Sequence, residues 1–86
     1  MITREEIIQK TNEALAREFE LSPQQLVPTA TFQTDLGLDS LDAVDMVVVL
    51  EQAFGMTLRQ GYDLRAIATL NDLYDFIEKL AREHQA

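Results

Sequence analysis

Apolar residues recur at every third or fourth position in three stretches of this 86-residue chain, and this spacing predicts three main helices. The first is predicted at about residues 4–18, where Thr3 can cap the helix and Glu6 can reach back to it. The last follows Thr69 or Asn71, either of which can serve as its cap. The positions expected to face the core are Ile7, Ile8, Thr11, Ala14, Leu15 and Phe19 in the first helix, and Leu70, Leu73, Phe76, Ile77 and Leu80 in the last.

The middle helix has more apolar surface than one packing contact needs. It is predicted to begin after Asp39, whose carboxylate can cap it, and to end at Gly55. Its core side is expected to consist of Ala43, Met46, Val47, Leu50 and Phe54. A second apolar stripe, with its polar edges, consists of Leu41, Val44 and Val48 with Asp45, Gln52 and Glu51. This stripe is either covered by the preceding loop or kept for a partner, and its place just past Ser40 favours a partner.

The connections between the helices are unequal. Residues 19–38 form a long first loop in which apolar anchors recur, and Ser22-Pro23 predicts a short helical turn at 23–26. Such a pinned loop would let the first two helices lie roughly parallel. In the second connection, Asp63 could cap a short helix that ends at Ala68. The predicted fold is an all-α, small up-and-down bundle with three main helices, one short helix and a long first loop, in a single domain over residues 1–86.

Composition and charge narrow the function. The chain is 47% hydrophobic, has no cysteine and has no apolar run longer than Met46–Leu50, so disorder, disulfides and a membrane span are not expected. The N-terminus has acidic residues where a signal peptide would have an apolar run, so a cytoplasmic location is expected. The net charge of -8 disfavours binding to nucleic acid, whose phosphate backbone is also negative. Residues 35–54 contain five acids and no base, which favours steering toward basic patches on partners.

Ser40 is a poor candidate for a catalytic nucleophile. The single histidine is His84, near a C-terminal end that is expected to fray, and no Gly-x-Ser-x-Gly elbow surrounds Ser40. Neighbouring carboxylates would make its hydroxyl less nucleophilic, so no catalytic residue is predicted and Ser40 is better suited to be another enzyme's substrate. The aspartates around it lack the order of a calcium loop. Loose Mg²⁺ or Ca²⁺ association at Asp42 and Asp45 is conceivable, but no dedicated metal site is predicted.

The run Asp35-Leu-Gly-Leu-Asp-Ser-Leu-Asp42 opens an acidic amphipathic helix in a domain of this size, and it resembles the acyl carrier proteins. The resemblance extends over nearly the whole chain. It implies that Ser40 carries a 4′-phosphopantetheine arm, which a phosphopantetheinyl transferase (holo-acyl-carrier-protein synthase) moves from coenzyme A, normally with Mg²⁺. The arm's thiol would hold acyl intermediates as thioesters for fatty-acid, polyketide or related lipid biosynthesis. The residues that match the family's recognition helix are Asp39, Leu41, Asp42, Val44, Asp45, Val48 and Glu51.

The resemblance also implies which enzymes bind the protein, and it leaves alternative functions open. Acyl-transferring and chain-elongating enzymes with basic docking patches would bind this helix, and the carrier would be a monomer without catalysis of its own. The bundle interior of the family shelters the acyl chain, and here that space could be lined by Val47, Leu50, Phe54, Leu64, Ile67 and Leu73. Arg59 and Arg65 depart from the acidic pattern of housekeeping carriers, which indicates either a specialised pathway or neutral variation on a solvated loop. A peptidyl or aminoacyl carrier, and an acidic interaction module without a prosthetic group, remain alternatives.

Overall fold

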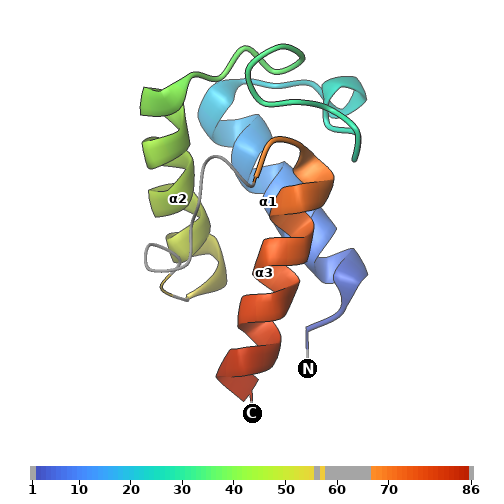
Figure 1. Cartoon of the computed structure of the whole chain (residues 1–86), viewed down its shortest axis with the longest axis vertical. Helices are drawn as coiled ribbons and strands as arrows, with labels where there is room; N and C mark the ends of the chain where they lie inside the picture. Colours follow the sequence, from blue (N-terminus) through green and yellow to red (C-terminus); the bar gives the residue numbers. More distant parts are fainter. Residues whose placement is uncertain (1, 56, 58–66, 86) are drawn as a thin grey trace.

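The computed structural model describes residues 2–55, 57 and 67–85 of the chain. Three helices form the bundle: α1 (Arg4–Phe19), α2 (Ser40–Phe54) and α3 (Leu70–Gln85) (Figure 1). A short 3-10 helix, η1 (Pro23–Gln25), lies in the loop between α1 and α2. The all-α class, the three main helices and the helical turn in the first loop are therefore confirmed. Within the described residues, no helix is long and apolar enough to cross a membrane.

Local sequence signals set the helix ends. The Thr3 hydroxyl accepts a hydrogen bond from the backbone N–H of Glu6 at 3.2 Å, and the first helix begins there. The last helix is capped by Thr69 rather than Asn71, because the Thr69 hydroxyl accepts the backbone N–H of Asp72. Although fraying was expected from Glu83 onward, α3 continues through Gln85.

The first connection differs from its prediction. α1 and α2 run in opposite directions (Figure 1), so the prediction that they lie roughly parallel was wrong. The reason is that the buried anchors of the first loop hold it across one end of the bundle instead of along its length. These anchors are Leu26, Ala30, Phe32, Leu36 and Leu38. The short helix predicted from Asp63 lies outside the described residues except for Ile67 and Ala68, which are not helical.

The core lies where α1 packs against α2 and α3. Ile7, Leu15 and Leu50 have no exposed surface, and the predicted core side of each helix is confirmed in outline. Phe54 and Phe76 are only partly buried, because both lie at the margin of this core. Tyr74 was not predicted as a core residue, yet its side chain is almost fully buried between helices.

A backbone contact ties the first loop to the start of α3. Thr31 and Thr69 form an isolated antiparallel β-bridge, and among the described residues this is the one piece of β-pairing. It brings residues from both connections to the end of the bundle where α2 begins (Figure 1).

Candidate functional site at the start of helix α2

The start of α2 is fixed by its backbone and by two carboxylates. Gly37 has a φ of 67°, a left-handed conformation that costs glycine little, and it turns the chain into the helix. The Asp39 carboxylate accepts hydrogen bonds from the backbone N–H groups of Leu41 and Asp42, both at 3.0 Å. Asp42 returns the contact by accepting the N–H of Asp39 at 3.2 Å. Ser40 is therefore the first helical residue, between two reciprocal caps.

The residues that follow Ser40 leave apolar surface uncovered. The Leu41 side chain is 77% exposed and that of Val44 is 59% exposed, so the first loop does not cover this part of the second stripe. Asp39 and Asp45 are exposed beside it, whereas Asp42, Val48 and Glu51 are half-buried. The structure thus brings the recognition-helix residues together on α2, with Leu41 and Val44 as their exposed apolar centre. We call Leu41, Val44, Asp39, Asp42 and Asp45 the docking face.

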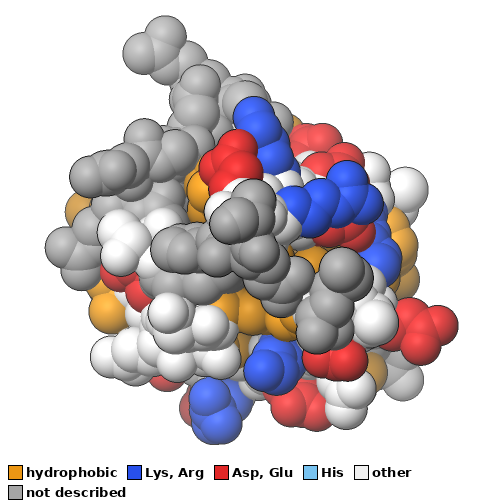
Figure 2. Space-filling model, turned by 90° about the horizontal axis from the view of Figure 1, so that it is seen from below, with side chains coloured by type: hydrophobic (Ala, Val, Ile, Leu, Met, Phe, Trp, Pro, Cys, Tyr) orange, Lys and Arg blue, Asp and Glu red, His pale blue; other side chains and the backbone are white. Residues whose placement is uncertain are grey.

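The charge on the docking face differs from that at the other end of the molecule. Every charged residue of α2 is an acid, whereas acidic and basic side chains alternate at the end that carries the start of α1 and the end of α3 (Figure 2). There, Arg82 pairs with Glu78 at 3.1 Å. The negative field of the molecule is therefore concentrated on α2, where it can attract a basic surface.

Among the described residues, no group of three or more His, Cys, Asp or Glu side chains is arranged to hold a metal ion. Asp39 and Asp42 are instead used as helix caps. The lack of a dedicated metal site stays a prediction for the chain as a whole.

A pocket of about 310 Å³ opens beside the start of α2. One side is α2 itself and the other side combines the first loop with the segment before α3. Its lining residues are Thr31, Phe32, Gln33, Thr34, Leu38, Asp39, Ala43, Met46, Ile67 and Ala68. The buried members form an apolar floor, and three of the exposed members, Gln33, Thr34 and Asp39, form a polar rim.

This pocket has a different lining from the interior space suggested by the sequence, which stays a prediction. Of the six residues proposed to line an interior space, Ile67 lines this pocket, and Leu64 lies outside the described residues. Leu50 and Leu73 are packed in the core with no exposed surface. The sequence did not predict that residues of the first loop line a pocket. These residues have no regular periodicity, so the sequence does not indicate which of them face α2.

The surroundings of Ser40 suit a long covalent group. Its neighbours Asp39 and Leu41 are exposed, so an enzyme could reach this turn, and Asp39 also lines the pocket. An amphipathic group that started here would find a polar rim followed by an apolar floor. A hydroxyl-bearing residue at such a place fits a phosphodiester-linked arm.

Comparison with known proteins agrees with this geometry. A family model described as a phosphopantetheine attachment site matches residues 9–77. The chain is 37% identical over 79 residues to an acyl carrier protein of Thermotoga maritima, which covers 92% of this chain and 96% of that protein. It is 37% identical over 82 residues to one of Rubrobacter xylanophilus, covering 95% of each chain. It is 33% identical over 76 residues to one of Thermosynechococcus vestitus, covering 88% of this chain and 93% of the relative.

Fold and site together define a helical domain of the phosphopantetheine-attachment class. Within that class, the chain belongs to the acyl carrier protein family. Its cofactor is covalently attached 4′-phosphopantetheine, and its role is to carry acyl groups for biosynthetic enzymes.

Proposed function

We propose that Ser40 is the attachment residue and that residues 1–86 form one carrier domain that presents acyl groups to successive partner enzymes. The observation that supports Ser40 best is its position as the first residue of α2, beside the pocket and the docking face. When bound, the arm supplies a terminal thiol that holds an acyl group as a thioester. The chain's own residues fix the backbone at the attachment point and offer a surface to the partner.

The other serine of the chain is a weaker candidate. The Ser22 hydroxyl contacts the Gln25 side-chain oxygen at 3.2 Å, and the Ser22 N–H donates to the same oxygen at 2.9 Å. Ser22 is therefore engaged as the N-cap residue of η1. This makes Ser22 a matched control for Ser40.

In this proposal the docking face binds basic patches on partner enzymes. Leu41 and Val44 supply apolar contact, while Asp39, Asp42 and Asp45 steer the encounter, with Val48 and Glu51 extending the surface along α2. Such a small surface gives fast dissociation, which a carrier visiting several enzymes requires. The first of these partners is the phosphopantetheinyl transferase.

We further propose that the protein has no catalytic activity of its own. The side chains next to Ser40 in the chain are a carboxylate and a leucine, and His84 belongs to the last turn of α3, at the opposite end of the bundle from the start of α2 (Figure 1). A serine nucleophile would need a base within hydrogen-bond reach. The carrier is proposed to act as a monomer in the cytoplasm.

The pathway is proposed to be fatty-acid, polyketide or related lipid biosynthesis. Leu-Gly-Leu-Asp before Ser40 favours this class over a peptidyl or aminoacyl carrier. A specialised pathway remains a hypothesis that rests on Arg59 and Arg65, which lie outside the described residues. Reversing both charges should change turnover by a cognate synthase, and unchanged kinetics would remove the hypothesis.

Intact mass measurement tests the attachment. The protein is incubated with coenzyme A, Mg²⁺ and a broad-specificity phosphopantetheinyl transferase, alongside Ser40→Ala and Ser22→Ala. The parent and Ser22→Ala should each gain one arm, and Ser40→Ala should gain none. If none of the three gains mass with a second transferase while all remain folded, the protein is instead an acidic interaction module.

A further inference from the structure

One wall of the pocket is built from two segments that are far apart in the chain. Residues 28–32 of the first loop lie against residues 67–71, and we call this pair the clasp. Backbone N–H groups of Phe32, Leu70 and Asn71 donate across it to the carbonyl oxygens of Ala68 at 3.1 Å, Ala30 at 3.1 Å and Pro28 at 2.9 Å. Four clasp residues line the pocket: Thr31, Phe32, Ile67 and Ala68.

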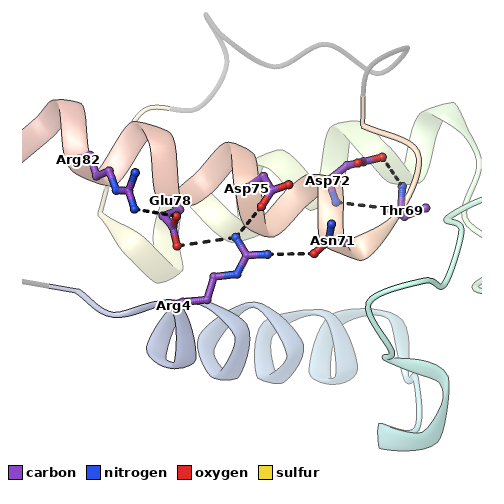
Figure 3. Close-up of polar contacts among 7 residues, drawn as sticks. All are labelled: Arg4, Thr69, Asn71, Asp72, Asp75, Glu78 and Arg82. Carbon is purple, nitrogen blue, oxygen red and sulfur yellow. Dashed lines mark hydrogen bonds and ion pairs between the residues drawn. The ribbon is translucent and has the colours of Figure 1, made fainter.

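The second segment of the clasp, residues 67–71, is bound by the carboxylate of Asp72. Asp72 accepts hydrogen bonds from the backbone N–H groups of Ala68 at 3.1 Å and Thr69 at 3.2 Å, both through Oδ2. The Thr69 hydroxyl accepts the N–H of Asp72 in return, and Figure 3 shows these two side chains facing one another. The Thr69 contacts are an ordinary helix cap. The contact with Ala68 goes beyond the cap, because Ala68 precedes the capping residue and lines the pocket.

The backbone of Ala68 is held by hydrogen bonds on two sides. Its methyl side chain is exposed, so burial of that side chain contributes little to its position. Its backbone is held on one side by the Phe32 N–H and on the other by the Asp72 carboxylate. Hydrogen bonds to a charged acceptor are stronger than those between neutral groups.

We infer that Asp72 is a positioning residue for the pocket, holding Ala68 and, through the clasp, Phe32 as the wall opposite α2. The relevance of that wall to the acyl cargo rests on the proposed function, whereas the placement itself does not. Removing the carboxylate should free Ala68, loosen the Phe32–Ala68 hydrogen bond and change the surroundings of Met46 on the pocket floor.

Two variants separate this role from general stabilisation of α3. Asp75, one turn further along α3, binds Arg4 at 2.6 Å and does not line the pocket, so Asp75→Asn is a matched control (Figure 3). Thr69→Val removes the hydroxyl that caps the Asp72 N–H but keeps the carboxylate with its two backbone donors.

The experiment uses the full chain without an arm. Amide hydrogen exchange is measured at Phe32 and Leu70, and the methyl NMR signal of Met46 is followed in the parent, Asp72→Ala, Asp75→Asn and Thr69→Val. Asp72→Ala should speed exchange at both amides by about tenfold and shift the Met46 signal, because charge-assisted hydrogen bonds are lost locally. Asp75→Asn should leave both readouts unchanged, and Thr69→Val should move them less than Asp72→Ala does.

The inference is overturned if Asp72→Ala leaves the Phe32 amide and the Met46 methyl unchanged. It is also overturned if Thr69→Val reproduces the full effect, since capping would then explain it, or if exchange rises equally at the core amides of Ile7 and Leu50. These readouts need no attached group. A failure of arm uptake by mass would therefore count against the proposed function and leave this result standing.

Discussion

The docking face of α2 and the surface where α1 packs against α3, which we call the seam, are both rich in polar groups. The polar groups of the two surfaces have different partners. In the seam, Arg4 of α1 donates to Asp75 at 2.6 Å and to Asn71 at 2.9 Å, so its charge is used within the molecule (Figure 3). On the docking face, Leu41 and Val44 are exposed and acids surround them. One surface fixes the fold, and the other presents exposed apolar and acidic side chains to the outside.

Tyr74 makes the seam specific as well as stable. Its hydroxyl donates to the Asn12 side-chain oxygen, and the Arg4 guanidinium lies 5.8 Å from the ring centre. Burial raises the pKa of Tyr74 above its ordinary value, so its hydroxyl stays protonated and can donate a hydrogen bond. A buried hydroxyl with one well-placed acceptor allows one relative placement of α1 and α3 and disfavours others. By contrast, α2 joins the bundle mainly through apolar residues.

The largest effect should come from the inner side of α2. Leu50→Ala should lower the free energy of unfolding by about 2–5 kcal/mol, because Leu50 has no exposed surface and the core can only partly close around the gap. Val44→Ala, six positions earlier on the same helix, should cost under about 0.5 kcal/mol. Urea denaturation of both variants checks this. Equal losses would show that the docking face is part of the fold.

The outer side should govern partner binding instead. Leu41→Ala or Asp45→Lys should reduce kcat/KM for the phosphopantetheinyl transferase roughly tenfold, the loss that about 1.4 kcal/mol represents, with the melting temperature nearly unchanged. Glu18→Lys makes the same charge change at an exposed position of α1 and should leave the kinetics near those of the parent. If Glu18→Lys has as large an effect, overall charge and not the docking face controls the encounter.

The seam should respond in the opposite way. Tyr74→Phe removes one hydroxyl and leaves the Asn12 acceptor without its donor, so stability should fall by about 1 kcal/mol. Transferase kinetics at a temperature where both proteins are folded should not change. A lower kcat/KM in this variant would mean that the seam and the docking face are coupled.

The smallest effect should be the contribution of Asp72 to acid stability. The pKa of its carboxyl is lowered, first because it accepts the Ala68 backbone N–H and then because it accepts that of Thr69. A lowered folded-state pKa adds stability above the ordinary carboxyl value, and this contribution is lost as the pH falls through the folded pKa. The stability difference between the parent and Asp72→Asn should therefore be constant near neutral pH and shrink below about pH 4. A difference that grows in acid would reverse the assigned sign.

The elements that sequence predicted well are those set by local chemistry. The cap at Asp39 and the helix end at Gly55 depend on residues that are neighbours in the chain, and the structure has both. The exposure of Leu41 followed from an apolar surplus on one helix, which periodicity reveals. The family resemblance likewise rested on a continuous run of residues around Ser40.

What the sequence determined by itself was therefore the helices, their ends, the acidic apolar stripe and the serine at its start. Only the tertiary structure decided that Tyr74 is buried against Asn12, that α1 and α2 are antiparallel, and that the first loop meets the start of α3 to form the clasp and the pocket. These features join residues that are far apart in the chain. Local propensity and periodicity carry no information about such pairs, because each is selected by how the whole bundle closes.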